Sequence, residues 1–325
     1  MRARLLTALV LATLSSGRPV LAQADSCPRR ALPVSIINKR GEAVHGLSAN
    51  NFQAMVKGKA VKVLSVTAND PHVRTMILLD RSSSMLQGEL VWNGYLEAAK
   101  ALASRMPHGS VTGVTAFADE ILGSVPFTSD AEGLRDALSG LSSVPKSLKQ
   151  RGGATALWDA LVSAASFFEN PRPGDTIYAL TDGGDNSSRI RHERAQKILE
   201  SKGIRLFAFS IPAGGERGTR GEARDLEQLA RATGGNVVTV TRKYKELAAL
   251  LTDGSGKPTE EAGWLASQFH QIYDFYQIEI ELPEIGKKPS KWSLVVVGPN
   301  QPDLVLSYPQ ELAACNEMAA DSKTK

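Results

Sequence analysis

Two apolar stretches of the sequence each end in an aspartate, and this pattern is typical of a ligand site. Residues 73–79 lead into Asp80, and residues 176–181 lead into Asp182. If both stretches are parallel strands of one sheet, both carboxylates lie at the carboxyl edge, where open α/β sheets bind ligands. The sequence therefore predicts a site at this edge that carries two negative charges.

Hydroxyl residues accompany the two aspartates. Ser82 and Ser84 alternate in the turn after Asp80, and Thr155 precedes a predicted helix whose first residues open at the same edge. Two carboxylates and three hydroxyls make an all-oxygen ligand set, which favours a hard cation: Mg²⁺ first, with Mn²⁺ or Ca²⁺ as alternatives. The two carboxylates only neutralise such an ion, so a carboxylate from a partner could complete its shell.

Each of these residues also has a purely structural interpretation. Aspartates at strand ends and serines in turns commonly cap the helix that follows, and Thr155 could do the same. The order of the residues and their placement on successive strand-to-helix loops favour the metal site over capping.

Three short motifs resemble those of von Willebrand factor A domains. The matching segments are Asp80-Arg81-Ser82-Ser83-Ser84, Thr155 within Gly152-Gly153-Ala154-Thr155-Ala156-Leu157, and Thr181-Asp182-Gly183-Gly184-Asp185. Together they resemble a complete metal-ion-dependent adhesion site. The resemblance implies that Ser82, Ser84 and Thr155 contact the ion through hydroxyls, and that Asp80 and Asp182 contact it directly or through water.

Other residues near this edge are assigned supporting roles. Asp185 is not a ligand in the family and is interpreted as a loop residue behind the ligands, with Gly153 in the neighbouring loop. Arg217 lies in the Gly-rich segment 212–225, which we interpret as a mobile surface loop, although it could hold anions or shape specificity.

The alternation of strands and helices predicts the fold class. Residues 71–255 alternate between the two, which indicates an α/β domain: a doubly wound, mainly parallel sheet with helices on both faces. The segments 25–70 and 256–325 are rich in strand signals, apart from a helix near 260–273 and a polar tail. We expect them to form a small antiparallel β unit around the inserted domain. These flanks resemble those of an exported bacterial family of proteins related to von Willebrand factor A domains, which implies binding rather than a known reaction.

The N-terminal residues 1–24 have the layout of a removable signal peptide. Arg2 and Arg4 precede an apolar run too short to cross a bilayer, and small residues follow it. Without this segment the chain has 35 basic and 34 acidic residues, a net charge of +1 instead of +4, which gives no support for nucleic-acid binding. No later segment reads as a transmembrane helix. We therefore expect a soluble protein in the periplasm or the medium.

The chain has only two cysteines, Cys27 and Cys315, close to the two ends of the mature chain. In an oxidising compartment they could form a disulfide, and two unpaired thiols are the alternative.

Three functions fit these observations. The first is an extracytoplasmic, adhesion-type module that holds a divalent metal and coordinates an Asp or Glu carboxylate of a protein partner. The second is a structural protein of the envelope whose fold the metal stabilises. The third, a metal-dependent hydrolase with Ser82 or Ser84 as nucleophile, is disfavoured because no histidine lies near the site loops to act as a base. We therefore expect a protein that is not an enzyme.

Overall fold

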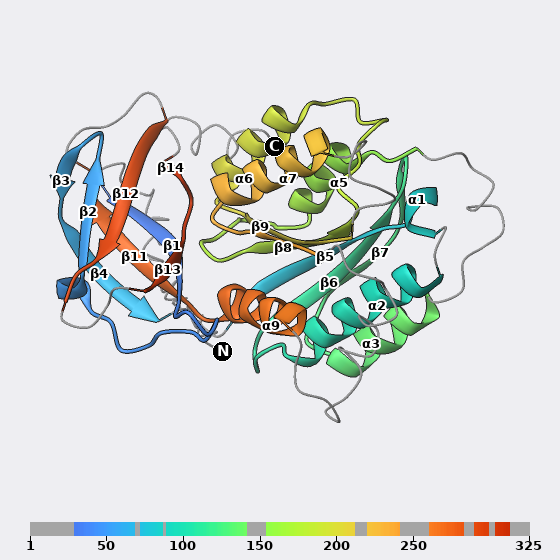
Figure 1. Cartoon of the computed structure of the whole chain (residues 1–325), viewed down its shortest axis with the longest axis horizontal. Coiled ribbons are helices and arrows are strands. Elements are labelled where there is room, and N and C mark those ends of the chain that lie inside the picture. The colour runs from blue at the N-terminus through green and yellow to red at the C-terminus, as the bar shows by residue number, and fades with distance from the viewer. Residues whose placement is uncertain are drawn as a thin grey trace, which may run out of the picture.

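The computed structural model describes residues 29–68, 72–86, 89–141, 154–211, 220–240, 260–282, 289–298 and 303–312. These residues form a central α/β domain beside a unit of two antiparallel sheets (Figure 1). Several predicted features lie outside the described residues: the signal peptide, Gly153, Arg217 and both cysteines.

The α/β domain is built on a six-stranded sheet. Its strands are parallel to one another except for the edge strand β7, which is antiparallel to β6. In sheet order the strands are β10 (Val237–Thr239), β9 (Arg205–Ser210), β8 (Thr176–Thr181), β5 (Arg74–Asp80), β6 (Val111–Phe117) and β7 (Ile121–Thr128). All residues of β8 and β9 are buried, as expected for central strands covered on both faces.

Helices cover both faces of this sheet, which confirms the predicted fold class (Figure 1). The helices are α1 (Ser83–Leu86), α2 (Glu89–Ser104), α3 (Ala131–Gly140), α5 (Leu157–Ser166), α6 (His192–Lys202), α7 (Arg220–Ala232) and α9 (Glu260–Tyr273). Apolar residues of α2, α3 and α9 share one core cluster with the sheet, and those of α5, α6 and α7 share the other.

The sequence pattern missed four elements of this domain, one of which is the short helix α1. Strand β7 is an edge strand interrupted by Gly123 and Pro126, and its half-exposed residues give no clear alternation. Strand β10 has only three residues. The segment 212–225 was predicted to be a surface loop, but helix α7 begins within it, at Arg220. The prediction was therefore wrong for residues 220–225. Leu226 and Leu229, further along α7, are buried and form the apolar face of this helix.

The strands from the two ends of the chain pair with one another. One sheet has the order β13-β1-β11-β4 and the other β14-β12-β2-β3, and their facing residues form a third core cluster. The strands are β1 (Arg29–Ile37), β2 (Phe52–Val56), β3 (Lys59–Val61), β4 (Val63–Ala68), β11 (Phe275–Glu281), β12 (Ser290–Val296), β13 (Val305–Ser307) and β14 (Glu311–Leu312), with a 3₁₀ turn, η1 (Ala49–Asn51), before β2. The predicted antiparallel unit is therefore confirmed, whereas the domain boundaries near 70 and 255 stay predictions.

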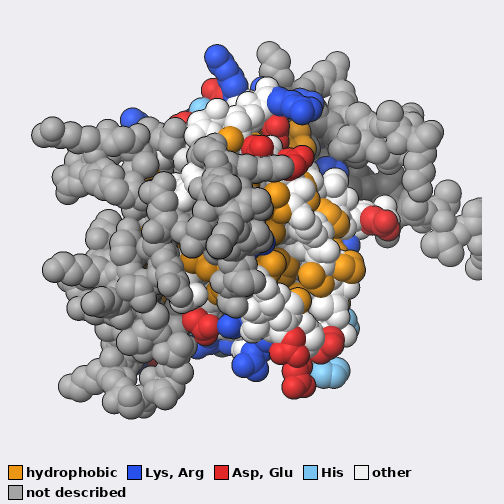
Figure 2. All heavy atoms as spheres, turned by 90° about the vertical axis from the view of Figure 1, so that its right-hand side faces the viewer, with side chains coloured by type: hydrophobic (Ala, Val, Ile, Leu, Met, Phe, Trp, Pro, Cys, Tyr) orange, Lys and Arg blue, Asp and Glu red, His pale blue; other side chains and the backbone are white. Residues whose placement is uncertain are grey.

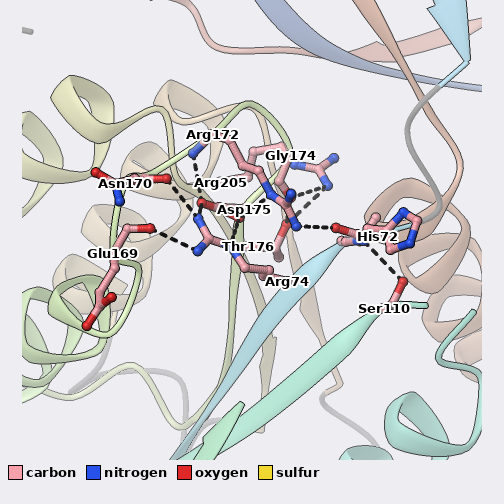
Figure 3. A network of polar contacts seen from close by, with 11 residues as sticks. His72, Arg74, Ser110, Glu169, Asn170, Arg172, Gly174, Asp175, Thr176 and Arg205 are labelled. Atoms are coloured by element: carbon pink, nitrogen blue, oxygen red, sulfur yellow. Dashed lines mark hydrogen bonds and ion pairs between the residues drawn. The ribbon is translucent and has the colours of Figure 1, made fainter. Parts of the chain in front are cut away.

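A buried arginine joins this β unit to the α/β domain. Arg205, at the start of β9, is fully buried and donates to groups of both parts. Figure 3 shows it beside Gly174 and Thr176 of the α/β domain. Its acceptors are the carbonyl oxygens of Gln271 (2.8 Å), Ile272 (2.8 Å) and Gly174 (3.2 Å), Thr176 Oγ1 (3.0 Å) and Ser35 Oγ (3.2 Å). Burial lowers the pKa of Arg205 to about 9, an effect that the nearby Asp175 opposes.

Asp175 organises the loop that leads into β8. Arg74 Nε donates to Asp175 Oδ1 at 2.8 Å, and the backbone N–H of Arg172 donates to Asp175 Oδ2 at 2.9 Å (Figure 3). The Arg172 side chain then reaches the carbonyl oxygen of His72 at 2.6 Å. This network fixes the amino ends of β5 and β8, opposite to the edge where the sequence predicts a metal.

We expect Arg205→Leu to lower the free energy of unfolding by about 3 kcal/mol, because several buried acceptors lose their donor and each unsatisfied group costs about 1–3 kcal/mol. Urea unfolding followed by circular dichroism measures this. The exposed Arg194 on α6 offers a matched control, and Arg194→Leu should change the stability by less than about 0.5 kcal/mol. Equal effects of the two substitutions would contradict the role given to Arg205.

Candidate metal centre

The carboxylate of Asp80 is buried at the carboxyl end of β5, with no exposed surface. Its Oδ1 accepts from the backbone N–H of Ser82 at 2.8 Å, and its Oδ2 accepts from the hydroxyl of Thr181 at 2.7 Å. Thr181 ends the neighbouring strand β8, so the parallel pairing of β5 and β8 brings the two residues together. These bonds hold the carboxylate in one orientation.

The carboxylate of Asp182 lies close enough to that of Asp80 to contribute to a raised pKa of Asp80. Burial raises the pKa of Asp80 from 3.8 to about 7, and the neighbouring Asp182 carboxylate adds to the effect. Asp182 is also buried, and its Oδ1 accepts from the backbone N–H of Gly184 at 3.0 Å. The sheet edge therefore concentrates negative charge in a place where water does not stabilise it.

The two serine hydroxyls lie together beside these carboxylates. Ser82 Oγ and Ser84 Oγ are 3.1 Å apart, and Ser82 contacts Asp80 through its backbone N–H. The chain turns here from β5 into the short helix α1, which begins at Ser83. The prediction that Ser82 and Ser84 alternate in an extended turn was wrong, because the chain is helical from Ser83 on, but their hydroxyls still lie next to each other.

Thr155 is connected to the loop that carries Asp182. Its backbone N–H donates to Asn186 Oδ1 at 2.8 Å, and its carbonyl oxygen accepts from the N–H groups of Asn186 and Ser187. The Thr155 side chain is almost fully buried. The structure thus fastens the second predicted loop to the third through backbone bonds.

Asp185 has a role at the start of helix α5. Its Oδ1 accepts from the hydroxyl of Ser188 and lies 3.4 Å from the N–H of Trp158, while Ser188 Oγ accepts from the same N–H at 3.0 Å. Burial raises the pKa of Asp185. These contacts agree with its interpretation as a loop residue behind the proposed ligands.

Tyr95 holds the ends of two strands at this edge, a role that the sequence did not reveal. Its hydroxyl oxygen accepts from the N–H of Ile211 at 2.6 Å and lies 3.1 Å from the carbonyl oxygen of Thr181, to which it can donate. Tyr95 sits at an apolar position of α2, and spacing alone predicts only a core residue. Its polar end fixes the residue that bonds Asp80.

The donor chemistry of this edge fits a hard divalent cation. Asp80, Asp182, Ser82 and Ser84 offer only oxygen, and the two acidic groups are buried against each other. Within the described ranges no cluster of three or more histidine, cysteine or acidic residues occurs, so a nitrogen- or sulfur-rich metal site has no support there. Figure 2 shows the molecule from the α1 side, where hydrophobic side chains lie between acidic groups on the described part of the surface.

Tyr95→Phe should lower the free energy of unfolding by about 1–3 kcal/mol, because the buried N–H of Ile211 loses its acceptor. Thermal and urea unfolding measure the loss. Tyr178→Phe is the matched control, because Tyr178 is equally buried but its hydroxyl has no hydrogen-bond partner among the described residues. A smaller loss for Tyr95→Phe than for the control would contradict the assignment.

The chain was compared with curated proteins and with solved structures. No curated protein matches the sequence significantly. Among solved structures, an aerotolerance-related membrane protein from Bacteroides fragilis is 22% identical over 62% of this chain and 98% of its own, with a TM-score of 0.44. A von Willebrand factor type A protein from Catenulispora acidiphila is 14% identical over 88% of this chain and 74% of its own, with a TM-score of 0.46. Proximal thread matrix protein 1 from the mussel byssus, with a zinc-occupied metal-ion-dependent adhesion motif, is 21% identical over 60% and 48%, with a TM-score of 0.43.

A family model gives the assignment directly. The von Willebrand factor type A domain matches residues 75–184, a segment that begins in β5 and ends in the loop after β8. This segment holds Asp80, Ser82, Ser84, Thr155 and Asp182. The chain therefore contains a von Willebrand factor type A domain over residues 75–184.

Proposed function

We propose that this protein is a binding module that holds one divalent cation at the carboxyl edge of its sheet and uses it to grip an acidic group of a protein partner. Asp80, Ser82, Ser84, Thr155 and Asp182 would hold the ion, with Mg²⁺ favoured and Mn²⁺ or Ca²⁺ as alternatives. The ion supplies a positive charge that attracts an Asp or Glu carboxylate.

One observation carries this proposal: two buried carboxylates, those of Asp80 and Asp182, lie at the ends of adjacent strands. Burial, with a contribution from the charge of Asp182, raises the pKa of Asp80 to about 7, which expresses the cost of ionising Asp80 in this place. The Asp80 carboxylate accepts from the Thr181 hydroxyl and from the backbone N–H of Ser82, which are neutral donors and compensate a buried charge only weakly. A divalent cation compensates both charges at once and leaves an open position for a further anion.

The contacts of the serines favour binding over catalysis. The described partners of Ser82 are Ser84 and Asp80, and none is a histidine that could act as a general base. A serine whose hydroxyl is directed to a metal is also a poor nucleophile. We therefore propose a protein that is not an enzyme.

We also propose that the protein acts outside the cytoplasm. The layout of residues 1–24 supports export, and among the helices of the described part none is long and apolar enough to cross a membrane. Export would expose Cys27 and Cys315 to an oxidising compartment, where a disulfide between them could form. Mass spectrometry of the mature protein with and without reductant tests both points.

Asp80→Asn should abolish metal binding without destabilising the metal-free protein. The substitution removes the buried charge but keeps the size and one acceptor oxygen. With EDTA at pH 8 we expect a Tm equal to or higher than that of the wild type. With millimolar Mg²⁺, Mn²⁺ or Ca²⁺ only the wild type should gain stability, by about 2.7 kcal/mol at a hundred times the dissociation constant.

Two comparisons complete this test. Asp185→Asn changes a carboxylate outside the proposed ligand set and should leave the metal response intact. A pull-down of acidic partners, run with and without EDTA, then asks whether the metal binds the partner. The proposal fails if no metal shifts the Tm of the wild type, and a metal shift without metal-dependent partner binding would favour a structural role for the ion.

Metal affinity should depend on pH through Asp80. Its pKa is about 7 in the metal-free folded state and 3.8 as the ordinary value, so the folded state binds this proton more tightly. The proton on Asp80 therefore stabilises the metal-free folded state. This stabilisation is fully present below pH 4 and is lost as the pH rises towards 7. Metal binding must displace the proton, so affinity should fall about tenfold per pH unit below 7.

Isothermal titration calorimetry in buffers of different ionisation enthalpy measures the protons released. At pH 6 about one proton should leave per metal ion bound, and at pH 8.5 fewer. A proton count that does not change between these two pH values would contradict the assignment of Asp80 as a ligand.

A further inference from the structure

A small cavity lies at the junction of the α/β domain and the β unit, near the amino ends of β5 and β8. Its volume is about 50 Å³. Its lining includes Arg74, Arg172 and Asp175 of the α/β domain and Phe275 and Gln277 from β11 of the β unit. A single water needs about 10–15 Å³ of such space, so the cavity has room for a small ion.

Positive charge is in excess around this cavity. Asp175 is the one acidic residue of the lining, and two arginines share it: Arg74 Nε donates to its Oδ1 at 2.8 Å, and Arg172 Nε lies 3.9 Å from the same oxygen. A third arginine lies behind the lining, because the guanidinium carbon of Arg205 is 4.2 Å from the ring centre of Phe275. Three guanidinium groups are therefore gathered around one carboxylate.

The charge of Arg205 has little compensation within the protein. Its hydrogen-bond acceptors are neutral carbonyl and hydroxyl oxygens, and its buried Nε has no hydrogen-bond partner in the described part of the chain. Burial lowers the pKa of Arg205 to about 9, so the side chain still carries its charge at pH 7. A buried charge without full compensation is unfavourable, and a nearby anion relieves this cost.

The guanidinium of Arg172 borders the cavity and keeps unused donors. One of its terminal nitrogens donates to the carbonyl oxygen of His72, which also lines the cavity, at 2.6 Å (Figure 3). Apart from this bond and the ion pair with Asp175, the guanidinium makes no polar contact with the residues that the structure describes. A guanidinium has five N–H donors, and 49% of this side chain is exposed, so donors remain for an anion.

Gln277 brings an uncharged donor from the β unit. It lies on the same face of β11 as Phe275, because side chains two residues apart in a strand point to the same side. The Phe275 ring contacts Gly174, so this face of β11 is directed at the loop before β8. The cavity is therefore bounded by hydrogen-bond donors from both parts of the protein.

We propose that this cavity binds a small oxyanion, phosphate or sulfate, which accepts from the guanidinium of Arg172 and the side-chain amide of Gln277. Bonds between arginine and such an anion are charge-assisted and among the stronger hydrogen bonds of proteins. The anion links the α/β domain to the β unit and reduces the excess of positive charge around Arg205. The site is independent of the proposed metal, which lies at the other ends of the same strands.

Isothermal titration calorimetry with inorganic phosphate and with sulfate tests this site, in chloride buffer of constant ionic strength. EDTA is present throughout, because a divalent ion at Asp80 and Asp182 could itself bind phosphate. Arg172→Gln removes the positive charge, and Gln277→Glu adds a negative charge to the cavity at nearly unchanged size. Gln53→Glu, at an exposed position of β2, is the matched control for the added charge.

We expect phosphate or sulfate to bind the wild type and Gln53→Glu equally well. Arg172→Gln and Gln277→Glu should each bind about tenfold more weakly or worse, because one loses a charge-assisted bond and the other adds repulsion. Phosphate should also raise the Tm of the wild type more than that of Gln277→Glu, whereas the general effect of such salts would raise both alike. Circular dichroism verifies that each variant is folded, and Gln277→Glu keeps the test decisive if Arg172→Gln does not fold.

Three results would overturn the proposal: no binding of either anion to the wild type at millimolar concentration, unchanged binding to both cavity variants, or equal weakening by Gln53→Glu and Gln277→Glu. The last result would show that the anion responds only to the overall charge of the protein. Because no metal takes part, none of these results bears on the metal site.

Discussion

The parallel pairing of β5 with β8 is the constraint on which the proposed metal site depends. Parallel strands in register end at the same level, so Asp80 and the Thr181–Asp182 pair are brought together by backbone hydrogen bonds before any ligand is present. The Thr181 hydroxyl then holds Asp80, and the end of β8 is itself held by Tyr95 from α2. Positions in the site are thus fixed by the sheet, while the loops only have to bring Ser82, Ser84 and Thr155 near it.

This arrangement concentrates an unfavourable charge in a rigid place. A flexible loop would relieve the repulsion between two carboxylates by moving one of them into water. Here both are buried at the ends of covered strands, so burial, together with the charge of Asp182, keeps the pKa of Asp80 raised in the folded state. The rest of the fold, with apolar clusters on both faces of the sheet, must supply the stability that keeps the two groups in position.

The opposite edge of the sheet has the reverse electrostatics. There Arg74 and Arg172 surround Asp175, and the buried Arg205 satisfies carbonyl oxygens at the end of α9 and the hydroxyl of Ser35 from β1. One edge therefore holds two buried acidic groups, and the other joins two parts of the protein. Buried polar groups therefore have different functions at the two ends of the same strands.

Many of the strands and helices could be predicted from the sequence, because they depend on local residue patterns. Apolar runs that end in aspartate gave β5 and β8, and helical spacing gave α3 and α9 with nearly the observed ends. The strand β7 and the polar roles of Tyr95 and Arg205 could not be found in this way. Their functions depend on partners that lie far away in the sequence, such as Ile211 for Tyr95 and Gln271 for Arg205. The type of one residue in an apolar pattern does not indicate which distant residue it will contact.

The antiparallel unit also constrains how the chain can fold. Ala31 of β1 pairs with Glu279 of β11, so the first strand has to wait for a partner about 250 residues further along the chain. Closing so long a loop in an unfolded chain is entropically costly and slow. Prior folding of the inserted α/β domain brings the flanking segments close together and shortens the effective loop. The β unit should therefore be the last part to assemble: during synthesis β2 and β3 can already pair with each other, whereas β1 and β4 wait for β11.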